Sequence, residues 1–489
     1  MSKTGPPARP ILQVVQALVI LLIGQAMASM DASILAVASP SLKTSLDASG
    51  GQLQLIVAMY ALAFGTLVVT GARLGATLGY RRAFIWGLAA FTAASLAAGL
   101  VPSARALVVA RACQGAAAAL MTPQVLSIIQ LQYQAERRAR AIGAYSMILA
   151  VGVAAGQLLG GLLTSLQLVS AAWRPALLIN APVGALLLLG ARRWLPPMVG
   201  GDRQRLDPAG VALLAVALLA LVLPLTFGRQ AHWPAWVWPS LVAGAAAAAA
   251  FVRLEHKLID RSARPLLDVR LLDLPGVAAG VLAVLLIMAC YSGFLITLTL
   301  FLQGEPLVFS PLRAGATFAV YASGFATASL TWTRMPARYH DGLPIAGPLV
   351  MGVALLAVGL ASADGRWETA VTTPLLFAGG VGHAWAFSPL ASRLTASVGG
   401  ANAADMSGFI LTASLVGQVV GVAAFTGIYL SHASSDPGSA LALTTGAFAA
   451  TTILTAACAK AAVVRGGHAV ARKTLRASVP RRSVGRNQR

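Results

Sequence analysis

Charge is scarce in this chain of 489 residues, and acidic charge is the scarcest. Asp, Glu, Lys and Arg make up 10% of the residues, and only 15 residues are acidic. A soluble domain carries about 25% charged residues. Hydrophobic residues reach 57% and the mean hydropathy is +0.77. Because the deficit of charge runs along the whole sequence, the composition excludes an ordinary soluble protein and indicates one that crosses a membrane many times.

Cysteine is also rare, and the usual signs of an enzyme are missing. Cys113, Cys290 and Cys458 all fall in apolar stretches, and three such thiols give no disulfide framework. The sequence has no nucleotide-binding loop, no paired intramembrane acids and no His/Cys cluster at metal-ligand spacing. We therefore expect a protein that is not an enzyme and that needs neither a metal nor another cofactor.

Long apolar segments fill most of the chain. A spanning helix needs about 20 apolar residues, and fourteen segments fit that requirement. The predicted fold class is an all-α integral membrane protein with 14 transmembrane helices. The first apolar run is too long for a cleaved signal peptide, so we expect it to be retained. The segments are 13–37, 53–73, 83–101, 105–129, 140–164, 174–192, 208–227, 236–253, 274–301, 312–333, 343–361, 370–391, 405–430 and 438–460.

The basic residues orient these spans. An even number of spans places both termini on one side, and lysine and arginine mark the cytoplasmic side. With cytoplasmic termini, 29 of the 36 Lys and Arg residues fall in cytoplasmic tails and loops, and six fall outside. We expect a multi-pass protein of the plasma (inner) membrane with both termini cytoplasmic. The net charge of +21 then indicates contact with anionic membrane lipid rather than with nucleic acid.

A short internal echo divides the chain into related parts. The sequence GQLLG at 156–160 matches GQVVG at 417–421, which lies 261 residues later. Two related six-helix halves are a common plan for transporters. The predicted domains are an N-terminal six-helix half at 1–195, an inserted two-helix linker at 196–265, a C-terminal six-helix half at 266–464 and a basic cytoplasmic tail at 465–489.

Asp31 is the only carboxylate that we expect inside the membrane. It sits in a long stretch without other charge, and Arg111 lies in a similar stretch at 106–126. At 1.5 Å per residue Asp31 is roughly 27 Å into its helix, and Arg111 is roughly 9 Å from the outer end of its own. The two charges therefore lie at comparable depth. An intramembrane acid is costly unless it is paired, protonated or facing water, so a lone acid and a lone base suggest proton coupling.

Two glycine-containing motifs follow from the spacing of small and basic residues. In the loop at 71–82, glycines permit a tight turn, and arginines can bind helix ends or an acid on the other half. In the segment 140–164, small residues four apart allow helices to approach closely. The motif residues are Arg73, Gly75, Gly79, Arg81 and Arg82 in the loop, and Gly152, Gly156, Gln157, Gly160 and Gly161 in the segment.

Together these pieces resemble the 14-helix drug:proton antiporter branch of the major facilitator superfamily, over residues 13 to 460. The sequence MDASILAVASP at 30–40 is similar to that branch's first-helix signature. The loop at 71–82, Arg111 with Gln114, and the glycines of 152–161 resemble further motifs. WRP at 173–175 before NAPVG at 180–184, and LQ at 302–303 before SPLRAG at 310–315, resemble two of its connections. The resemblance implies a multidrug-efflux type of exporter that usually acts as a monomer.

Two positions depart from the family's pattern. Ala76 stands where the loop motif normally has an acid that helps to lock the two halves in one state. With alanine at this position, the loop lacks the acid that the family uses for its usual contact between the halves. Separately, the second half offers no intramembrane acid of its own. Gln157 stands where the antiporter motif often has proline, so the residue that would bend the helix there is absent.

Polar side chains inside the spans are candidates for a substrate cavity. Each can equally hold two helices together, and a histidine can also relay protons near neutral pH. With one membrane acid committed to protons, we expect neutral, zwitterionic or singly charged amphiphilic substrates. The candidates are Gln25, Tyr60, Gln114, Gln124, Asn180, His383 and Gln418.

The predicted function is a proton-coupled antiporter that exports small amphiphilic molecules such as drugs, antibiotics or secondary metabolites by alternating access. Its partners are a small-molecule substrate, protons and membrane lipid. The alternatives are a proton-coupled uptake permease of the same superfamily and a non-transporting membrane sensor. The span count and the glycines at 152–161 favour export.

Overall fold

The computed structural model describes residues 11–48, 50–166, 171, 173–198, 207–228, 234–261, 266–398, 402–433 and 435–478. Within these ranges every regular element is a helix. The α-helices are α1 (Ile11–Leu46), α2 (Gly50–Leu78), α3 (Tyr80–Leu100), α4 (Ala104–Gln132), α5 (Ala135–Ser165), α6 (Arg174–Leu178), α7 (Asn180–Trp194), α8 (Pro208–Phe227), α9 (Val237–Asp260), α10 (Val277–Gln303), α11 (Pro311–Thr331), α12 (Ala337–His340), α13 (Leu343–Ala361), α14 (Thr369–Ser397), α15 (Ala403–His432) and α16 (Pro437–Ser478). Two short 3-10 helices are η1 (Val269–Asp273) and η2 (Trp332–Arg334).

The predicted apolar segments coincide with these helices. The segment predicted at 174–192 is divided at Ile179 into α6 and α7. Among the described residues, 11 helices are long and apolar enough to cross a membrane. The helices α8, α11 and α14 are not among them, so their crossing of the membrane stays a prediction.

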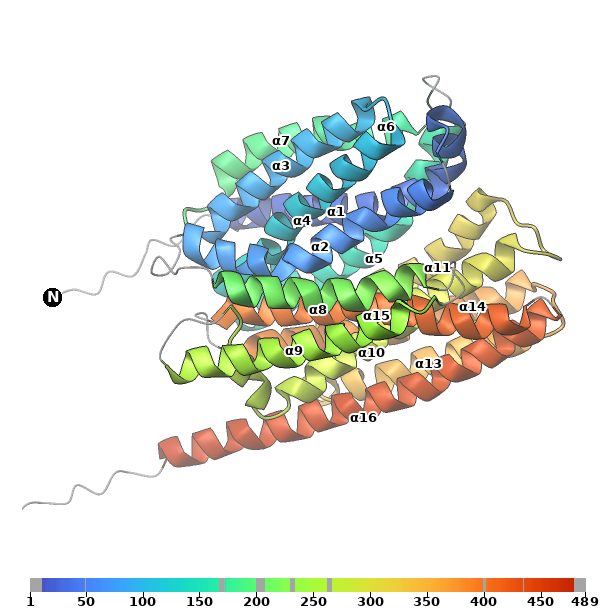
Figure 1. Ribbon diagram of the computed structural model, residues 1–489. Coiled ribbons are helices and arrows are strands. Elements are labelled where there is room, and N and C mark those ends of the chain that lie inside the picture. The colour runs from blue at the N-terminus through green and yellow to red at the C-terminus, as the bar shows by residue number, and fades with distance from the viewer. Residues whose placement is uncertain are drawn as a thin grey trace, which may run out of the picture.

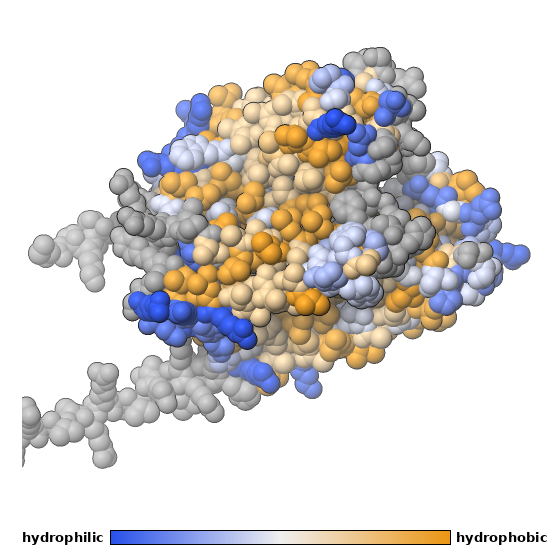
Figure 2. Space-filling model, in the orientation of Figure 1, coloured by the Kyte–Doolittle hydropathy of each residue, from blue (hydrophilic) through white to orange (hydrophobic). Residues whose placement is uncertain are grey.

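Exposed side chains on the outside of the bundle are apolar. Leu186, Val242 and Val353 are each exposed by 69% or more, which would be unfavourable in water. Figure 2 shows hydrophobic side chains over the middle of the molecule and hydrophilic ones gathered toward its ends. In lipid, only structures that satisfy their backbone groups internally can span the hydrocarbon. A bundle of helices satisfies its backbone groups internally, and its apolar outer surface suits contact with lipid.

The helices pack in two groups. In the first, α2 packs on α4, α1 on α5 and α3 on α4; in the second, α10 packs on α15, and α13 packs on α14 and α16. The two groups meet where α5 contacts α11 and α2 contacts α15. The start of α1 and the end of α16 lie at the same end of the bundle (Figure 1). We call that end the terminal end, and we call the two groups, α1–α7 and α10–α16, the first and second halves.

Helices α8 and α9 pack on each other and cover the seam between the halves. Helix α8 contacts both α2 and α15, and Figure 1 places the pair along one side of the bundle. The side chains of the α8–α9 pair belong to one hydrophobic cluster that includes residues of both halves. Its members include Val68 of α2, Leu214 of α8, Phe251 of α9 and Leu411 of α15. The pair therefore has a packing role between the halves and is more than a connection.

Close packing of α1 on α5 depends on the glycines of α5. A Cβ atom on Gly156 would lie 2.2 Å from Ser33 Oγ and 2.4 Å from the Met30 carbonyl oxygen. The Ser33 hydroxyl also donates 2.8 Å to the Val153 carbonyl oxygen of α5. A Cβ on Gly152 or Gly160 would likewise lie 2.7 Å from an atom of α1. This glycine face therefore fixes the position of α1, which carries Asp31. The side chain of Gln157 and the surroundings of Gly161 lie outside what the structure describes.

We expect Gly156→Ala to destabilise the protein by about 1–3 kcal/mol, because an added methyl group must push α5 away from the α1 backbone. Gly427→Ala is the matched control, since a Cβ at Gly427 of α15 meets nothing within 4 Å and alanine is the better helix former. Thermal unfolding of the two purified variants measures the difference. Equal unfolding temperatures would contradict the packing role of Gly156.

Candidate functional site

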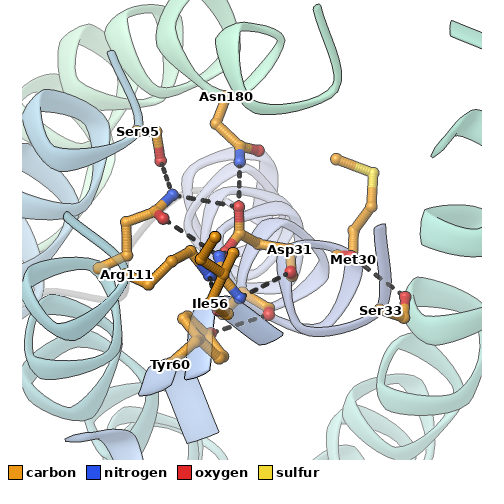
Figure 3. A network of polar contacts seen from close by, with 10 residues as sticks. Met30, Asp31, Ser33, Ile56, Tyr60, Ser95, Arg111 and Asn180 are labelled. Carbon is orange, nitrogen blue, oxygen red and sulfur yellow. Dashed lines mark hydrogen bonds and ion pairs between the residues drawn. The ribbon is translucent and has the colours of Figure 1, made fainter. Parts of the chain in front are cut away.

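Asp31 lies at the centre of a polar network inside the first half (Figure 3). Its side chain on α1 is fully buried and forms an ion pair with Arg111 of α4. Gln114 Nε2 of α4 donates to Asp31 Oδ1 over 3.2 Å, and Asn180 Nδ2 of α7 donates to the same oxygen over 2.8 Å. An ionised carboxylate only accepts hydrogen bonds. Because these partners all donate, the arrangement suits a charged ion pair.

Arg111 is equally well held. Its Nε donates 3.3 Å to the Ile56 carbonyl oxygen of α2, and its Nη1 donates 3.1 Å to Gln114 Oε1. The guanidinium carbon lies 4.6 Å from the centre of the Tyr60 ring, which is a cation–π distance. Removing two charges from water is costly unless hydrogen bonds satisfy the remaining donors and acceptors. Helices α1, α2, α4 and α7 together supply those bonds, so the fold compensates the cost of burying this pair.

Three residues predicted to line a cavity lie elsewhere. Gln114 and Asn180 belong to the Asp31 network, and Gln114 Nε2 also donates 2.8 Å to Ser95 Oγ of α3. Gln124 Nε2 donates 2.8 Å to the Gly71 carbonyl oxygen, which joins α4 to α2. The reason is geometric. A polar residue on a transmembrane helix can face a neighbouring helix instead of the central space, and the sequence alone does not set the rotation of the helix.

A cavity of about 190 Å³ lies between the two halves. Of the predicted residues, Gln25 and Tyr60 line it from the first half, and His383 and Gln418 line it from the second. None of the residues that line it carries a formal charge when histidine is neutral. The sequence reasoning missed further lining residues that share an aromatic ring or a hydroxyl group and that only their burial inside spans could have indicated. These are Ser29, Phe64, Thr122, Tyr145, Tyr291, Phe325, Phe387 and Ser414.

Tyr60 connects the cavity with the ion pair. Its side chain lines the cavity, its ring faces the Arg111 guanidinium, and its hydroxyl donates 2.9 Å to the Ala28 carbonyl oxygen of α1. Asp31 itself does not line the cavity. In this structure, therefore, Tyr60 contacts both the cavity and the Arg111 guanidinium, and Arg111 in turn pairs with Asp31.

The loop motif lies at the terminal end of the bundle. Gly79 has φ of +94°, which glycine adopts without strain, and it separates α2 from α3. Arg81 Nη2 donates 2.5 Å to the Arg192 carbonyl oxygen at the end of α7. A Cβ on Gly75 would lie 1.8 Å from Gln124 Oε1, so glycine at this position allows α4 to pack closely on α2. Arg82 is exposed.

Arg73 of the loop motif supplies a contact between the halves. Its Nη1 lies 3.4 Å from Asp405 Oδ1 at the start of α15, and the two side chains are 12% and 5% exposed. This contact takes its acid from the second half, whereas position 76 of the loop motif, where the family has an acid, carries alanine. The expectation that Asp31 is the only carboxylate inside the membrane stays a prediction, and two further acids are buried in helices that could span it. Asp405, at 3% exposure, and Glu255 of α9, at 0%, are buried within helices long enough to cross a membrane.

Two serines extend the contact between the halves at the terminal end. Ser127 Oγ of α4 lies 3.1 Å from Ser407 Oγ of α15, and Gln130 Nε2 lies 3.5 Å from the same oxygen. A Cβ on Gly143 of α5 would lie 2.2 Å from the Ser329 carbonyl oxygen of α11. The halves are therefore closely joined between the cavity and the terminal end.

We expect Asp405→Asn to shift the protein toward states that are open at the terminal end. Loss of this largely buried ion pair, whose charged atoms are 3.4 Å apart, should cost about 1–2 kcal/mol, between the values for exposed and buried pairs. Spin labels at positions 82 and 338, which are exposed residues of the two halves, report the change as a longer electron–electron distance.

The control for this measurement is Asp341→Asn. Asp341 Oδ1 lies 2.5 Å from Arg393 Nη1, and this exposed pair lies within the second half. Its loss should leave the distance between the labels unchanged. If the two variants gave the same distance distribution, Arg73 and Asp405 would have no part in holding the halves together.

The comparisons with known proteins agree on one family. The model described as Major Facilitator Superfamily matches residues 21–422. The chain is 31% identical over 455 residues to the "Probable actinorhodin transporter" of Streptomyces coelicolor, covering 91% of this chain and 78% of that protein. It is 32% identical over 449 residues to the "Cephamycin export protein CmcT" of Amycolatopsis lactamdurans, covering 89% of each. Among solved structures, the proton:xylose symporter XylE aligns with a TM-score of 0.65 and 14% identity over 92% of this chain and 95% of that one, which shows a common fold.

Proposed function

The chain belongs to the major facilitator superfamily, and on that premise we propose that it is a proton-coupled antiporter that exports small amphiphilic molecules. The relatives at 31% and 32% identity bear the names of a transporter and an export protein for antibiotics. The cargo proposed here is a molecule of that broad class, either a drug or a product of the cell itself. Transport proceeds by alternating access, in which the two halves open the cavity to one side of the membrane at a time.

The observation that carries this proposal is the buried pair of Asp31 and Arg111. Asp31 is the proton carrier, because it is a fully buried carboxylate that is linked to the cavity wall through Arg111 and Tyr60. A proton on Asp31 removes the charge that holds the Arg111 guanidinium, and the released guanidinium can then rearrange against Tyr60. Protonation thereby changes the wall of the cavity that Tyr60 forms. This link between proton and wall is the coupling that an antiporter needs.

We place both termini in the cytoplasm, in the plasma membrane, with 14 spans that include α8, α11 and α14. The excess of Lys and Arg in the predicted cytoplasmic loops supports this orientation. The contacts of Arg73 with Asp405 and of Ser127 with Ser407 would then close the cytoplasmic side. The structure would correspond to the state that exchanges protons and releases cargo outside. The proposed units are 1–195, 196–265, 266–464 and the tail 465–489, in a protein that acts as a monomer.

Transport in inside-out vesicles tests the function. With the protein in the membrane and the lumen acidified, an exporter accumulates cargo in the lumen, and a collapse of the proton gradient releases it. A growth-inhibition panel in a host without its own pumps first identifies a cargo to be labelled. Accumulation only when the lumen is made alkaline would instead indicate the uptake permease, and absence of any gradient-dependent transport would refute both.

A further inference from the structure

Several buried polar atoms at the cavity wall have no hydrogen-bond partner among the residues that the structure describes. In the first half these are Gln25 Oε1, Thr122 Oγ1 and the Tyr145 hydroxyl, and in the second half they are both ring nitrogens of His383. Nearly all buried polar groups in folded proteins are hydrogen-bonded, and those that are not call for an explanation. Such groups, facing one another across a shared cavity, are suited to bond to a molecule that enters it.

The same wall is aromatic on both sides. In the second half the His383 ring lies 4.8 Å from the Tyr291 ring and 4.5 Å from the Phe325 ring, measured between centroids. In the first half the Tyr60 and Phe64 rings are parallel within 4°, with centroids 6.3 Å apart. All five side chains line the cavity. Rings of this kind stack on flat apolar ligands in offset or edge-on arrangements.

Formal charge is kept out of the cavity. The lining residues within the described part of the chain include no Asp, Glu, Lys or Arg. The nearest ion pair behind the wall, Asp31 with Arg111, is mutually neutralised and lies behind Tyr60. An ion that enters such a space loses its hydration and finds no opposite charge, so its binding is disfavoured.

We propose that the cavity binds an uncharged, flat aromatic molecule of fused rings that carries hydroxyl or carbonyl groups at opposite edges. One edge bonds to Tyr145, Gln25 or Thr122 of the first half, and the other bonds to His383 of the second half. This assignment deepens the proposed export function, because it names the chemical class of the cargo. A ligand that bonds to both halves at once also suits a site that opens alternately to either side.

A series of matched probes on one ring system tests the class. The probes are 2,6-dihydroxynaphthalene, the cationic (6-hydroxy-2-naphthyl)trimethylammonium, the anionic 6-hydroxynaphthalene-2-sulfonate and the saturated decahydronaphthalene-2,6-diol. Their affinities for the wild-type protein in lipid nanodiscs are measured by equilibrium dialysis, with empty nanodiscs as the blank. We expect the neutral aromatic diol to bind at least tenfold more tightly than each of the other three probes.

Three single variants locate the binding groups. Tyr145→Phe and His383→Phe remove the unpartnered atoms but keep a ring in place, and each should weaken binding of the diol about threefold to tenfold, as expected for one hydrogen bond. Without ligand, both variants should be at least as stable as the wild type, because each loses a buried group without a partner. Ser323→Ala is the control, since the Ser323 hydroxyl of α11 is exposed, is not part of the cavity lining and donates 2.7 Å to the Val320 carbonyl oxygen; the affinity of this variant should change by less than about twofold.

Tightest binding of the cation or of the anion would overturn the proposal. Equal binding of all four probes, or unchanged affinity in both phenylalanine variants, would mean that these polar atoms are merely hydrated and would overturn it as well. Because dialysis needs no proton gradient, the result is independent of the proposed antiport. Gradient-driven export that fails while this order of affinities holds would refute only the export function.

Discussion

Asp31→Asn is expected to abolish proton-driven accumulation of cargo while leaving cargo exchange intact. Asparagine preserves the size of the side chain but cannot carry a proton, so no gradient can act through it. Exchange of labelled for unlabelled cargo requires the halves to alternate but requires no net movement of protons. In proteoliposomes, accumulation driven by a pH gradient should therefore fall to the level of empty liposomes, whereas exchange at equal pH should continue.

The pairing of two assays separates coupling from folding. A variant that is misfolded loses both accumulation and exchange, and such a result would call for Asp31→Glu, which keeps an acid at the site and should retain part of the coupling. Asp405→Asn serves as the control for removal of another buried carboxylate, and it should keep gradient-driven accumulation above that of empty liposomes. Accumulation by Asp31→Asn at the wild-type rate would exclude Asp31 as the proton carrier.

Arg111→Leu is expected to be the most destabilising single substitution in the network. Removal of one partner from a buried ion pair costs about 3–5 kcal/mol, because the other charge is left without compensation. Asp31 is fully buried, and Arg111 also bonds to Ile56 and Gln114, so several donors are lost together. Thermal unfolding in detergent, followed by tryptophan fluorescence, should show a large fall in the unfolding temperature.

A double variant shows whether the cost comes from the unpaired charge. Asp31→Asn combined with Arg111→Leu leaves no charge in the network, so most of the lost stability should return. Proton-driven accumulation should stay absent in the double variant, because the proton carrier is gone. If the double variant were as unstable as the sum of the two single variants, the pair would not be energetically coupled.

The ion pair could be anticipated from the sequence because charge is so rare in it. Two single charges in apolar stretches, at comparable depth from a rise of 1.5 Å per residue, are brought together by the fold as Asp31 and Arg111. The partners of the pair were harder to predict. Asn180 and Gln114 were assigned to the cavity because hydrophobic periodicity does not say which neighbour a polar side chain will meet. Their place on Asp31 depends on the rotation of α4 and α7.

The contact between Arg73 and Asp405 could not be predicted from the sequence, for a different reason. The two residues are 332 positions apart, and Asp405 stands at the start of an apolar segment, where an acid would ordinarily be read as solvated. Only the packing of α2 against α15 brings the acid to the loop motif. Taken alone, Ala76 suggests that one contact between the halves is lost. In the folded chain Asp405 of the second half supplies the acid for a different contact, with Arg73.

The helical segments themselves were predictable, since long apolar runs leave the backbone no alternative in lipid. The break at Ile179 between α6 and α7 was not predicted. The lining of the cavity was predicted only in part. His383 and Gln418 were identified as candidates, whereas Tyr145 and Tyr291 were not. A lining residue is defined by both halves together, so no single helix reveals it.

A measurement of the protons that move with cargo is the most direct test of Asp31 as the proton carrier. Proteoliposomes that contain a pH-sensitive dye and a cargo gradient at equal pH report proton flow in the direction opposite to the cargo. We expect the wild-type protein and the Asp405→Asn control to move protons, and Asp31→Asn to move cargo by exchange without any proton flow. Proton flow through Asp31→Asn that matches the wild type would contradict the account, because some other group would then carry the proton.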